Sequence, residues 1–346
     1  MNQESFNVVA IGGGTGLSTL LKGLKRHVRV TPAVTPLPEP PKPLPGPQID
    51  NLTAVVTVTD DGGSSGRLRR AFNILPPGDI RNCIVAMSED EALLAKLFQY
   101  RFSAGEGLEG HNFGNLFLTA MTALTDGDFA LAVRHACDIL AVRGHIYPAT
   151  TSHVQLVATM DDGSCVEGET KITASTKRIV RVDLVPEDAS PLPETLKAIA
   201  DADLITIGPG SLFTSLVTNL LVHGVVDAIA ESRATKVFIC NLMTQANETL
   251  NFTAADHIQA IRQHSGRRLF TYALINNAEL DPELRKKYAV EGAIPIAVDL
   301  DRVRALGVEP IVGDYLARGP VARHAADRVA AELLALLERV SRARAS

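Results

Sequence analysis

Tryptophan is absent from this chain of 346 residues, and cysteine is rare. Cys83, Cys137, Cys165 and Cys240 are far apart and form no Cys-x-x-Cys pair, which argues against a zinc site and against a disulfide framework. Histidine and cysteine spacings typical of metal ligands are missing as well. We therefore expect reduced thiols in a cytoplasmic protein.

The chain also lacks an excess of positive charge, because 34 Lys and Arg residues stand against 39 Asp and Glu residues, a net charge of −5. Such a chain has no global positive field to hold nucleic acid or an acidic membrane surface. It shows no basic and apolar leader, and no apolar run is long enough to span a membrane. We expect no nucleic-acid partner and no membrane span, and local groups must hold any anionic ligand.

Signatures of an activated serine are missing too, since neither a Ser-His-Asp order nor a Gly-x-Ser-x-Gly turn occurs. What is present is apolar material: 46% of the residues are hydrophobic. In a chain of this length that is enough to bury one large core. We expect residues 1–346 to form a single α/β domain.

Strand-like and helical patterns alternate along much of the chain. An apolar run over Phe6–Ile11 is followed by a helical pattern over Leu17–Arg26, and Leu204–Ile207 is followed by another helix. Alternation of this kind predicts a Rossmann-like, doubly wound and mostly parallel sheet. The other predicted strands, apolar runs and helices are Leu52–Thr59, Val237–Asn241, Tyr272–Ile275, Ile294–Val298, a mainly helical stretch over Asp79–Leu140, Ala254–His264 and a last helix from about Ala322.

Two segments depart from this alternation. Residues 32–48 are crowded with prolines and are predicted to be an insertion outside the sheet. Residues 145–185 alternate apolar and polar side chains around a turn at Asp161–Ser164, which predicts a small antiparallel β subdomain.

Two glycine-rich turns follow predicted strands and open predicted helices. The first, Gly12–Gly16, lacks the third glycine of the dinucleotide fingerprint and the Walker lysine, so a tight turn without a ligand explains it as well. The second is Gly208-Pro209-Gly210-Ser211. Because helix N-termini present unpaired N–H groups, each turn can hold a phosphate. We expect the two turns to flank one crevice at the switch point of the sheet.

The polar run Thr59–Arg67 also follows a predicted strand. Asp60 and Asp61 can accept hydrogen bonds from a ribose, or can hold Mg²⁺ against a diphosphate. Hydroxyl and guanidinium groups further along the run can donate to phosphate oxygens. A solvated turn is the alternative, because Asp-Gly is a common turn dipeptide.

Two helix starts carry further polar side chains. Asp79 is expected to cap a helix, and Arg81 in its first turn carries a charge that a helix N-terminus disfavours unless an anion is near. His111 and Asn115 lie four residues apart, on one face of another helix start. A structural role and a functional role remain open for His111.

Five motifs in order resemble the bacterial YvcK family of gluconeogenesis factors, within the CofD-like superfamily. They are Val55–Arg69, Pro77–Asn82, Gly110–Leu116, Ile207–Leu212 and Asn241–Gln245, and the likeness covers nearly the whole chain. The resemblance implies a cytoplasmic, homodimeric protein with a Rossmann-like fold. It further implies roles in cell shape and cell-wall precursor supply on gluconeogenic carbon, and binding of UDP-N-acetylglucosamine or an NAD-like dinucleotide.

The resemblance also implies that Asn241 and Arg323 reach the ligand. Arg323 precedes His324 in a pair that matches the family, although an ordinary surface arginine is the alternative. Residues and resemblance together predict this set of ligand-binding positions: Gly12, Gly13, Gly14, Thr15, Gly16, Thr59, Asp60, Asp61, Gly62, Gly63, Ser64, Ser65, Arg67, Asp79, Arg81, Asn82, His111, Asn115, Gly208, Pro209, Gly210, Ser211, Asn241 and Arg323.

Two functional hypotheses follow. In the first, the protein binds a small-molecule nucleotide ligand and passes that state to a regulatory partner protein. In the second, it resembles the CofD enzymes, and Asp60 or Asp61 positions Mg²⁺ on a nucleoside-diphosphate donor of a phospholactyl group. No convincing general base accompanies the two carboxylates, which favours the regulator.

Overall fold

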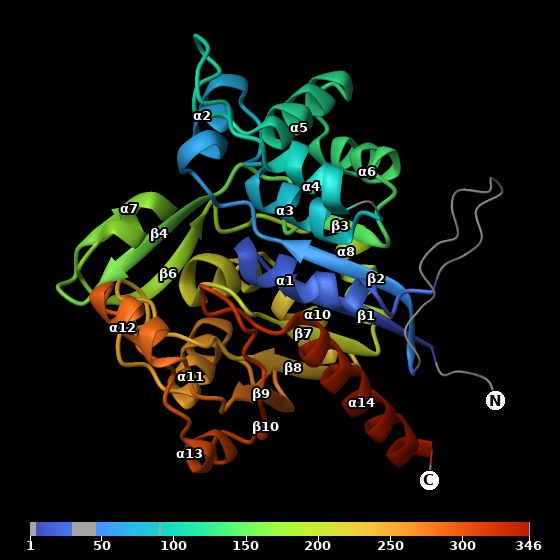
Figure 1. Ribbon diagram of the computed structural model, residues 1–346, viewed down its shortest axis with the longest axis vertical. Coiled ribbons are helices and arrows are strands. Elements are labelled where there is room, and N and C mark those ends of the chain that lie inside the picture. Colours follow the sequence, from blue (N-terminus) through green and yellow to red (C-terminus); the bar gives the residue numbers. More distant parts are fainter. Residues whose placement is uncertain (1–4, 30–45, 90, 346) are drawn as a thin grey trace.

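The computed structural model of the chain describes residues 5–29, 46–89 and 91–345 (Figure 1). The chain forms a seven-stranded sheet and a separate three-stranded sheet, with helices packed around them. The predicted α/β class is therefore confirmed. The proline-rich segment 32–48 lies almost wholly outside the described residues.

The large sheet is parallel throughout, in the order β10-β9-β8-β7-β1-β2-β3. Its direction of winding reverses beside β1, which lies between β2 and β7. In doubly wound sheets this switch point is where ligands bind, outside the carboxyl ends of the strands. The strands are β1 (Ser5–Gly12), β2 (Gln48–Val56), β3 (His145–Pro148), β7 (Leu204–Ile207), β8 (Thr235–Ile239), β9 (Tyr272–Asn276) and β10 (Glu309–Gly313).

The central strands are buried along nearly their whole length. All four residues of β7 are buried, as is the half of β1 from Val8 to Gly12. A strand with helices packed on both faces has apolar side chains on both faces. For this reason apolar and polar residues do not alternate in these segments of the sequence. Ile11 lies opposite Ile207 on one side and Val55 on the other, so three apolar strands meet just before the first glycine turn.

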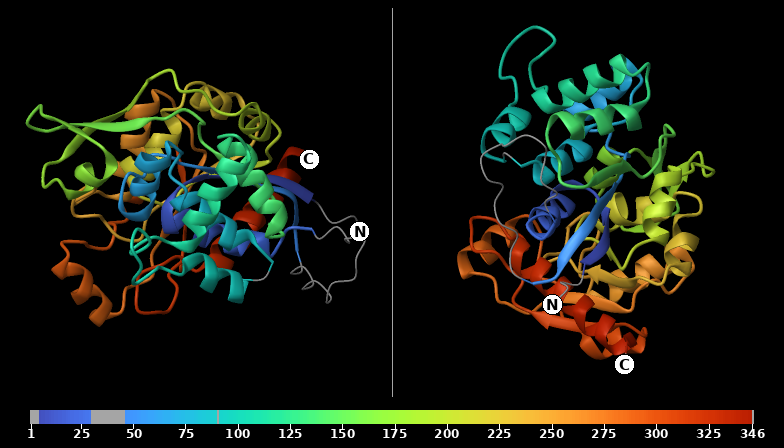
Figure 2. Two further views of the ribbon diagram at one scale, coloured as in Figure 1. Left: turned by 90° about the horizontal axis from the view of Figure 1, so that it is seen from above. Right: turned by 90° about the vertical axis from the view of Figure 1, so that its right-hand side faces the viewer.

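Helices lie on both sides of the large sheet (Figure 2). Helices α2 to α6 gather beyond the β2 and β3 end of the sheet, in the upper part of Figure 1. The bounds are α1 (Gly14–Lys25), α2 (Gly63–Phe72), α3 (Gly78–Met87), α4 (Glu91–Gln99), α5 (Phe113–Leu124), α6 (Phe129–Ile139), α8 (Pro193–Ala200), η1 (Leu212–Val217), α9 (Thr218–Leu220), α10 (Val225–Glu231), α11 (Ala254–Ser265), α12 (Pro282–Val290), α13 (Leu300–Ala305) and α14 (Ala326–Ala345).

The small antiparallel sheet has the order β5-β4-β6, with β4 (Gln155–Met160), β5 (Cys165–Glu167) and β6 (Ile179–Val185). A short helix, α7 (Glu169–Ala174), connects β5 to β6. The predicted antiparallel segment began at residue 145, but β3 (His145–Pro148) pairs in parallel with β2 in the large sheet. Alternation marks a half-buried strand without specifying its partner, which is why the sequence misplaced β3.

Other elements also differ from those predicted. The strand β2 begins at Gln48 and ends at Val56, so Thr57–Thr59 belong to the loop. The apolar run Ile294–Val298 makes only isolated bridges, through Pro295 and Ala297. The last strand is β10 instead, and the closing helix begins at Ala326.

In the described part of the chain, no helix by itself is sufficiently long and apolar to cross a membrane. Two sharply bent helix pairs, Phe113–Leu124 with Phe129–Ile139 and Leu212–Leu220 with Val225–Glu231, reach that length and composition only together.

Candidate functional site

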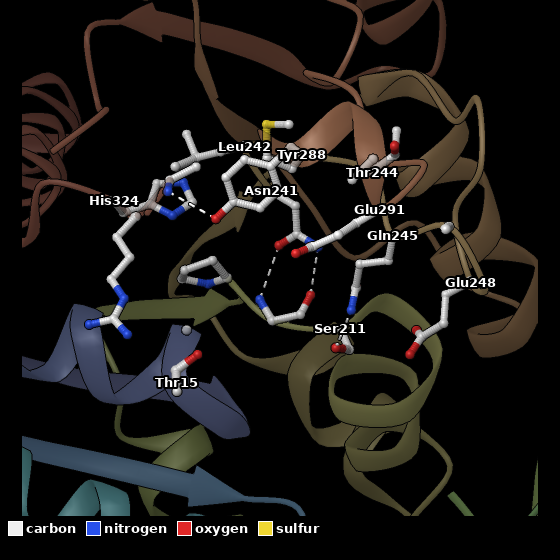
Figure 3. A pocket seen from close by; sticks show the side chains of 18 of the residues that line it. Thr15, Ser211, Asn241, Leu242, Thr244, Gln245, Glu248, Tyr288, Glu291 and His324 are labelled. Carbon is white, nitrogen blue, oxygen red and sulfur yellow. Dashed lines mark hydrogen bonds between the residues drawn. The ribbon is translucent and has the colours of Figure 1, made fainter. Parts of the chain in front are cut away.

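A cavity of about 520 Å³ opens at the carboxyl ends of β1, β7 and β8 (Figure 3). We call it the switch-point pocket. Segments far apart in the sequence meet there. Its lining residues are Thr15, Gly16, Thr19, Thr173, Pro209, Gly210, Ser211, Asn241, Leu242, Met243, Thr244, Gln245, Ala246, Asn247, Glu248, Tyr288, Glu291, Ala293, Ala322, Arg323 and His324.

The two glycine-rich turns touch each other at one edge of this pocket. A Cβ atom added at Gly16 would lie 2.3 Å from the carbonyl oxygen of Pro209, a distance that no side chain can adopt. Only glycine at position 16 allows the backbone of the second turn to approach so closely. The turns after β1 and β7 therefore share one edge of a single cavity.

Unpaired backbone amides lie along this edge. Within the described residues, the N–H groups of Thr15, Gly16 and Ser211 donate to no acceptor. Thr15 and Gly16 belong to the first turn of α1, and Ser211 is the residue before η1, which runs directly into α9. Amides at such helix starts favour an anion, through their own hydrogen bonds and through the helix dipole.

Side chains from the segment after β8 hold the second turn in place. The amide of Asn241 accepts from the Gly210 N–H at 3.1 Å and donates to the Gly210 carbonyl at 2.8 Å. Gln245 donates through Nε2 to the Ser211 hydroxyl at 2.8 Å, and Figure 3 shows these pairs with dashed lines. The amide oxygen of Gln245, Oε1, is buried and has no hydrogen-bond partner among the described residues. A buried acceptor without a donor beside a cavity is a position where a ligand N–H or O–H can bind.

Glu248 fixes the start of η1 from below the pocket. Its carboxylate accepts from the Phe213 N–H at 3.1 Å and from the Thr214 hydroxyl at 3.0 Å. The side chain is only 4% exposed, and this burial raises its pKa, while the bonds from Phe213 and Thr214 act in the opposite direction. Glu248 therefore stabilises the start of η1 and holds the N-terminal amides of that helix in a fixed position.

The positive charge available to an anionic ligand comes from Arg323, which is the one Lys or Arg among the residues that line the pocket. Desolvation of the half-buried His324 ring lowers its pKa to about 4, and its Nε2 lies 3.1 Å from the Cys240 carbonyl oxygen. A histidine with such a pKa is neutral near pH 7, so Nε2 carries the proton and donates to that carbonyl. The pocket thus offers backbone amides, neutral polar side chains and one guanidinium.

Many of the predicted residues do not line the switch-point pocket. They surround the N-termini of α2, α3 and α5, on the β2 and β3 side of the first glycine turn. This second group comprises Thr59, Asp60, Asp61, Gly62, Gly63, Ser64, Ser65, Arg67, Arg81, Asn82, His111 and Asn115. The sequence placed all of them in one pocket, but the structure divides the predicted residues between two regions.

Asp60 and Asp61 have different partners. Asp61 accepts from the backbone N–H of Thr170 at 2.8 Å and from its hydroxyl at 2.5 Å, so it holds α7. Asp60 accepts from the Gly62 N–H at 2.9 Å. In the described ranges, no group of three or more His, Cys, Asp or Glu side chains gathers around one point. The two neighbouring carboxylates therefore have separate partners within the protein.

Asp79 lies between the two regions. The helix α3 begins at Gly78 with Pro77 before it, so the predicted capping role of Asp79 is wrong. Burial raises the pKa of Asp79 to about 6, and a hydrogen bond from the Gly14 N–H opposes that shift. The amide of Gly14 is therefore used by the protein, unlike those of Thr15 and Gly16.

His111 precedes α5, which begins at Phe113, so His111 and Asn115 do not share the face of one helix. The His111 ring nitrogen Nδ1 lies 3.1 Å from the Ser64 hydroxyl. Thr59 donates its hydroxyl hydrogen to Glu169 at 2.9 Å. Both contacts join distant loops, and the structure shows a structural partner for each side chain.

Sequence reasoning missed several residues that line the pocket, above all Tyr288 and Glu291 near the end of α12. That helix carries no glycine turn or motif that would mark it. The segment Leu242–Gln245 did carry a signal, because it belongs to one of the five motifs that we quoted, but only Asn241 was taken from that motif.

The parallel sheet and the cavity at its switch point define the class of doubly wound α/β proteins with a pocket at the carboxyl edge of the sheet. Residues 8–316 match the family model described as 2-phospho-L-lactate transferase CofD. The gluconeogenesis factor of Halalkalibacterium halodurans is 47% identical over 330 residues, covering 95% of each chain. The gluconeogenesis factor of Bacillus subtilis is 45% identical over 332 residues, covering 96% of this chain and 98% of that protein.

Solved structures agree with these matches. The crystal structure of protein BH3568 from Bacillus halodurans superposes with a TM-score of 0.87 at 46% identity, covering 96% of this chain and 100% of that one. A relative from Nostoc is 47% identical over 310 residues, and the chain spans 63% of its length. The chain belongs to the CofD family, within its group of gluconeogenesis factors.

Proposed function

We propose that the protein is a cytoplasmic regulator that binds a nucleoside-diphosphate sugar of the UDP-N-acetylglucosamine type, or an NAD-like dinucleotide, in the switch-point pocket. One observation carries the proposal. The unpaired amides of Thr15, Gly16 and Ser211 lie on one edge of a cavity that also contains the guanidinium of Arg323. A diphosphate bridging two sugars needs this combination of donors over a short span.

The size and polarity of the pocket support the same ligand class. Its volume of about 520 Å³ falls within the range of roughly 300 to 1,000 Å³ typical of small-molecule sites. The buried Gln245 Oε1 without a donor suits a base N–H or a sugar hydroxyl. In the role we propose, occupancy of this pocket is passed to a partner protein and so links carbon supply to cell shape and cell-wall precursors.

Calorimetric titration tests the proposal. UDP-N-acetylglucosamine, NAD and a guanosine diphosphate compound are each titrated with and without Mg²⁺. We expect UDP-N-acetylglucosamine to bind without metal and to raise the melting temperature by mass action. Arg323→Gln should weaken binding by about tenfold or more, because it removes a charge-assisted hydrogen bond. The exposed Arg318, outside the pocket, supplies the matched control Arg318→Gln. Absence of binding by all three ligands would refute the proposal.

The second candidate is a metal-dependent transferase of a phospholactyl-type group, the activity in the name of the matching family model. The observation that favours it is a set of buried carboxyl groups beside the first glycine turn. Burial, with a smaller contribution from the charge of Asp60, raises the pKa of Asp79 to about 6 and that of Glu169 to about 8. Mg²⁺ would supply electrostatic stabilisation of a diphosphate leaving group, and Asp60 would be its ligand. Under this reading, binding depends on Mg²⁺, and Asp60→Asn lowers turnover far more than nucleotide affinity.

A further inference from the structure

The second region contains guanidinium groups without counterions. We define the arginine cluster as Arg67, Arg81 and Arg101, which stand around the starts of α2, α3 and α5. Arg67 donates to the Glu109 carbonyl at 2.8 Å, and Arg101 donates to the Gly110 carbonyl at 2.6 Å. No ion pair of any of the three occurs in the part of the chain that the structure describes, although the net charge is −5.

Arg81 is the central member of the cluster and is half-buried. It donates to the side-chain oxygen of Asn115 at 3.1 Å and to that of Asn82 at 2.8 Å. Its Nε is buried and has no acceptor among the described residues. Both of these partners are neutral amides, so neither of them balances the charge of Arg81. An arginine in the first turn of a helix is also opposed by the helix dipole.

Polar side chains from the starts of α2, α3 and α5 meet around Arg81. Ser65 and Asn115 are almost fully buried, and the Asn115 amide donates to the Ser65 hydroxyl at 3.4 Å. A Cβ added at Gly78 would lie 2.6 Å from that hydroxyl, so the starts of α2 and α3 meet at this point. Asn82 lies beside them in the first turn of α3. Three helix N-termini and three guanidinium groups therefore face the same region.

Negative groups face the region as well. Asp60 and Asp79 both act on the pKa of Arg81, where they oppose the lowering caused first by burial and then by Arg101. Neither lies within ion-pair distance of Arg81. Arg81 is therefore close to one other guanidinium and two carboxylates, and none of the described side chains forms an ion pair with it.

From these contacts we infer that the arginine cluster is a second anion-binding site, separate from the switch-point pocket, which takes the phosphate group of a small phosphorylated ligand other than the nucleotide. A phosphate has enough acceptor oxygens to reach Arg81, Arg101 and a helix N-terminus together, whereas a carboxylate has two. Arg81 Nε then gains the acceptor that the described residues do not provide.

The test uses inorganic phosphate as the probe, observed by ³¹P NMR line broadening, with UDP-N-acetylglucosamine at saturation so that the switch-point pocket is filled. We expect phosphate to bind under these conditions and to bind more tightly than acetate. Arg81→Gln and Arg101→Gln should each weaken phosphate binding by about tenfold. Arg101 is exposed, so its variant tests the site even if Arg81→Gln fails to fold. Arg70→Gln, an exposed arginine on α2 outside the cluster, is the matched control and should change binding by less than about twofold.

Three results would overturn the inference. Phosphate could fail to bind once the nucleotide is present, which would mean that both regions serve one ligand. Arg81→Gln and Arg101→Gln could both bind phosphate as the unaltered chain does. Acetate could bind more tightly than phosphate. If UDP-N-acetylglucosamine itself does not bind, the phosphate titration is run on Arg323→Gln, so the two proposals fail separately.

Discussion

The switch-point pocket and the arginine cluster use the same backbone device with different side chains around it. Both lie at helix N-termini that follow strands or loops at the carboxyl edge of the sheet. The pocket has a cavity of about 520 Å³, neutral polar walls and Arg323, whereas the cluster has three guanidinium groups above buried hydroxyls and amides. The volume and neutral donors of the pocket suit a large ligand with a diphosphate in its middle. The three guanidinium groups of the arginine cluster suit a small anion.

Asp79 separates the two regions. It accepts from the Gly14 N–H on the pocket side, and on the cluster side its charge opposes the lowering of the Arg81 pKa. Its charge therefore reaches both regions, and its position prevents Gly14 from serving as a phosphate donor. Neighbouring helix starts can therefore bind different ligands. The difference depends on whether nearby side chains accept hydrogen bonds from the N-terminal N–H groups or leave them unpaired.

The largest expected effect comes from closing the contact between the two turns. Gly16→Ala places a Cβ 2.3 Å from the Pro209 carbonyl oxygen, so the turns must separate. We expect a loss of about 3 kcal/mol of stability and of nucleotide binding. Gly12→Ala is the matched control, because its Cβ would meet Leu17 and Leu216 at an ordinary 3.5 Å. Urea unfolding and calorimetry measure both. A stable Gly16→Ala variant that binds nucleotide would show that the two turns need not touch.

A second prediction concerns pH and the carboxyl groups between the regions. Burial first, and then Asp60, raises the pKa of Glu169 to about 8 from an ordinary value of 4.5. The folded chain keeps this proton where the unfolded chain has lost it, so stability falls as pH rises from 4.5 to 8, on the order of 1 kcal/mol per pH unit. Asp79, whose pKa is raised from 3.8 to about 6, adds to the fall below pH 6.

Glu169→Gln should flatten this slope, because a glutamine can still accept from Thr59 but does not ionise. Urea unfolding at pH 5 and pH 8 measures the difference, with the exposed Glu187→Gln as control. An unchanged slope in Glu169→Gln would mean that Glu169 is ionised at neutral pH. The Glu169 carboxylate would then add a negative charge near the arginine cluster.

A third prediction separates the two neighbouring carboxylates. Asp61→Ala removes two hydrogen bonds from Thr170 and should lower the free energy of unfolding by about 1 kcal/mol without changing phosphate affinity. Asp60→Asn should instead tighten phosphate binding by about threefold, because it removes a negative charge near Arg81. Chemical denaturation and ³¹P NMR on both variants measure this division. The same effect from both would contradict it.

A fourth prediction concerns the wall of the pocket. Gln245→Met keeps the volume but removes the bond to the Ser211 hydroxyl and the free acceptor Oε1. We expect nucleotide affinity to fall by about fivefold in calorimetry, with phosphate binding at the cluster unchanged. Thr19→Val, on the same wall but with its hydroxyl bonded to the Thr15 carbonyl, is the control and should change affinity less. If both variants lost the same nucleotide affinity, Oε1 of Gln245 would have no specific role in binding.

Much of the fold could be predicted from the sequence, because its signals are local. The strand β7 has the predicted limits, and β1, α1 and α11 differ from prediction by only a few residues at their ends. Buried apolar runs and glycine turns determine such elements within a window of about ten residues. The strand β10 was missed because Glu309–Gly313 contains a proline and a partly exposed valine, so it lacks a clean apolar run.

The site was predicted less completely, for a physical reason. Sequence patterns identify residues able to bind phosphate, but not which of them share a cavity. Thr15, Pro209 and Asn241 meet because β1, β7 and β8 are neighbours in the sheet, and Tyr288 joins them from a helix with no motif. His111 and Arg67, which look equivalent to them in the sequence, lie in the other region.

The sequence by itself determined the strand, glycine turn and helix units, the buried apolar strands and the membership of the family, since each depends on residues close together in the chain or on whole-length similarity. Only the tertiary structure decided how the polar residues divide into two regions. That division depends on contacts such as Asp61 with Thr170 and Gly16 with Pro209, whose partners are more than a hundred residues apart. Packing of the sheet and helices brings such partners together, and no local pattern encodes the distance between them.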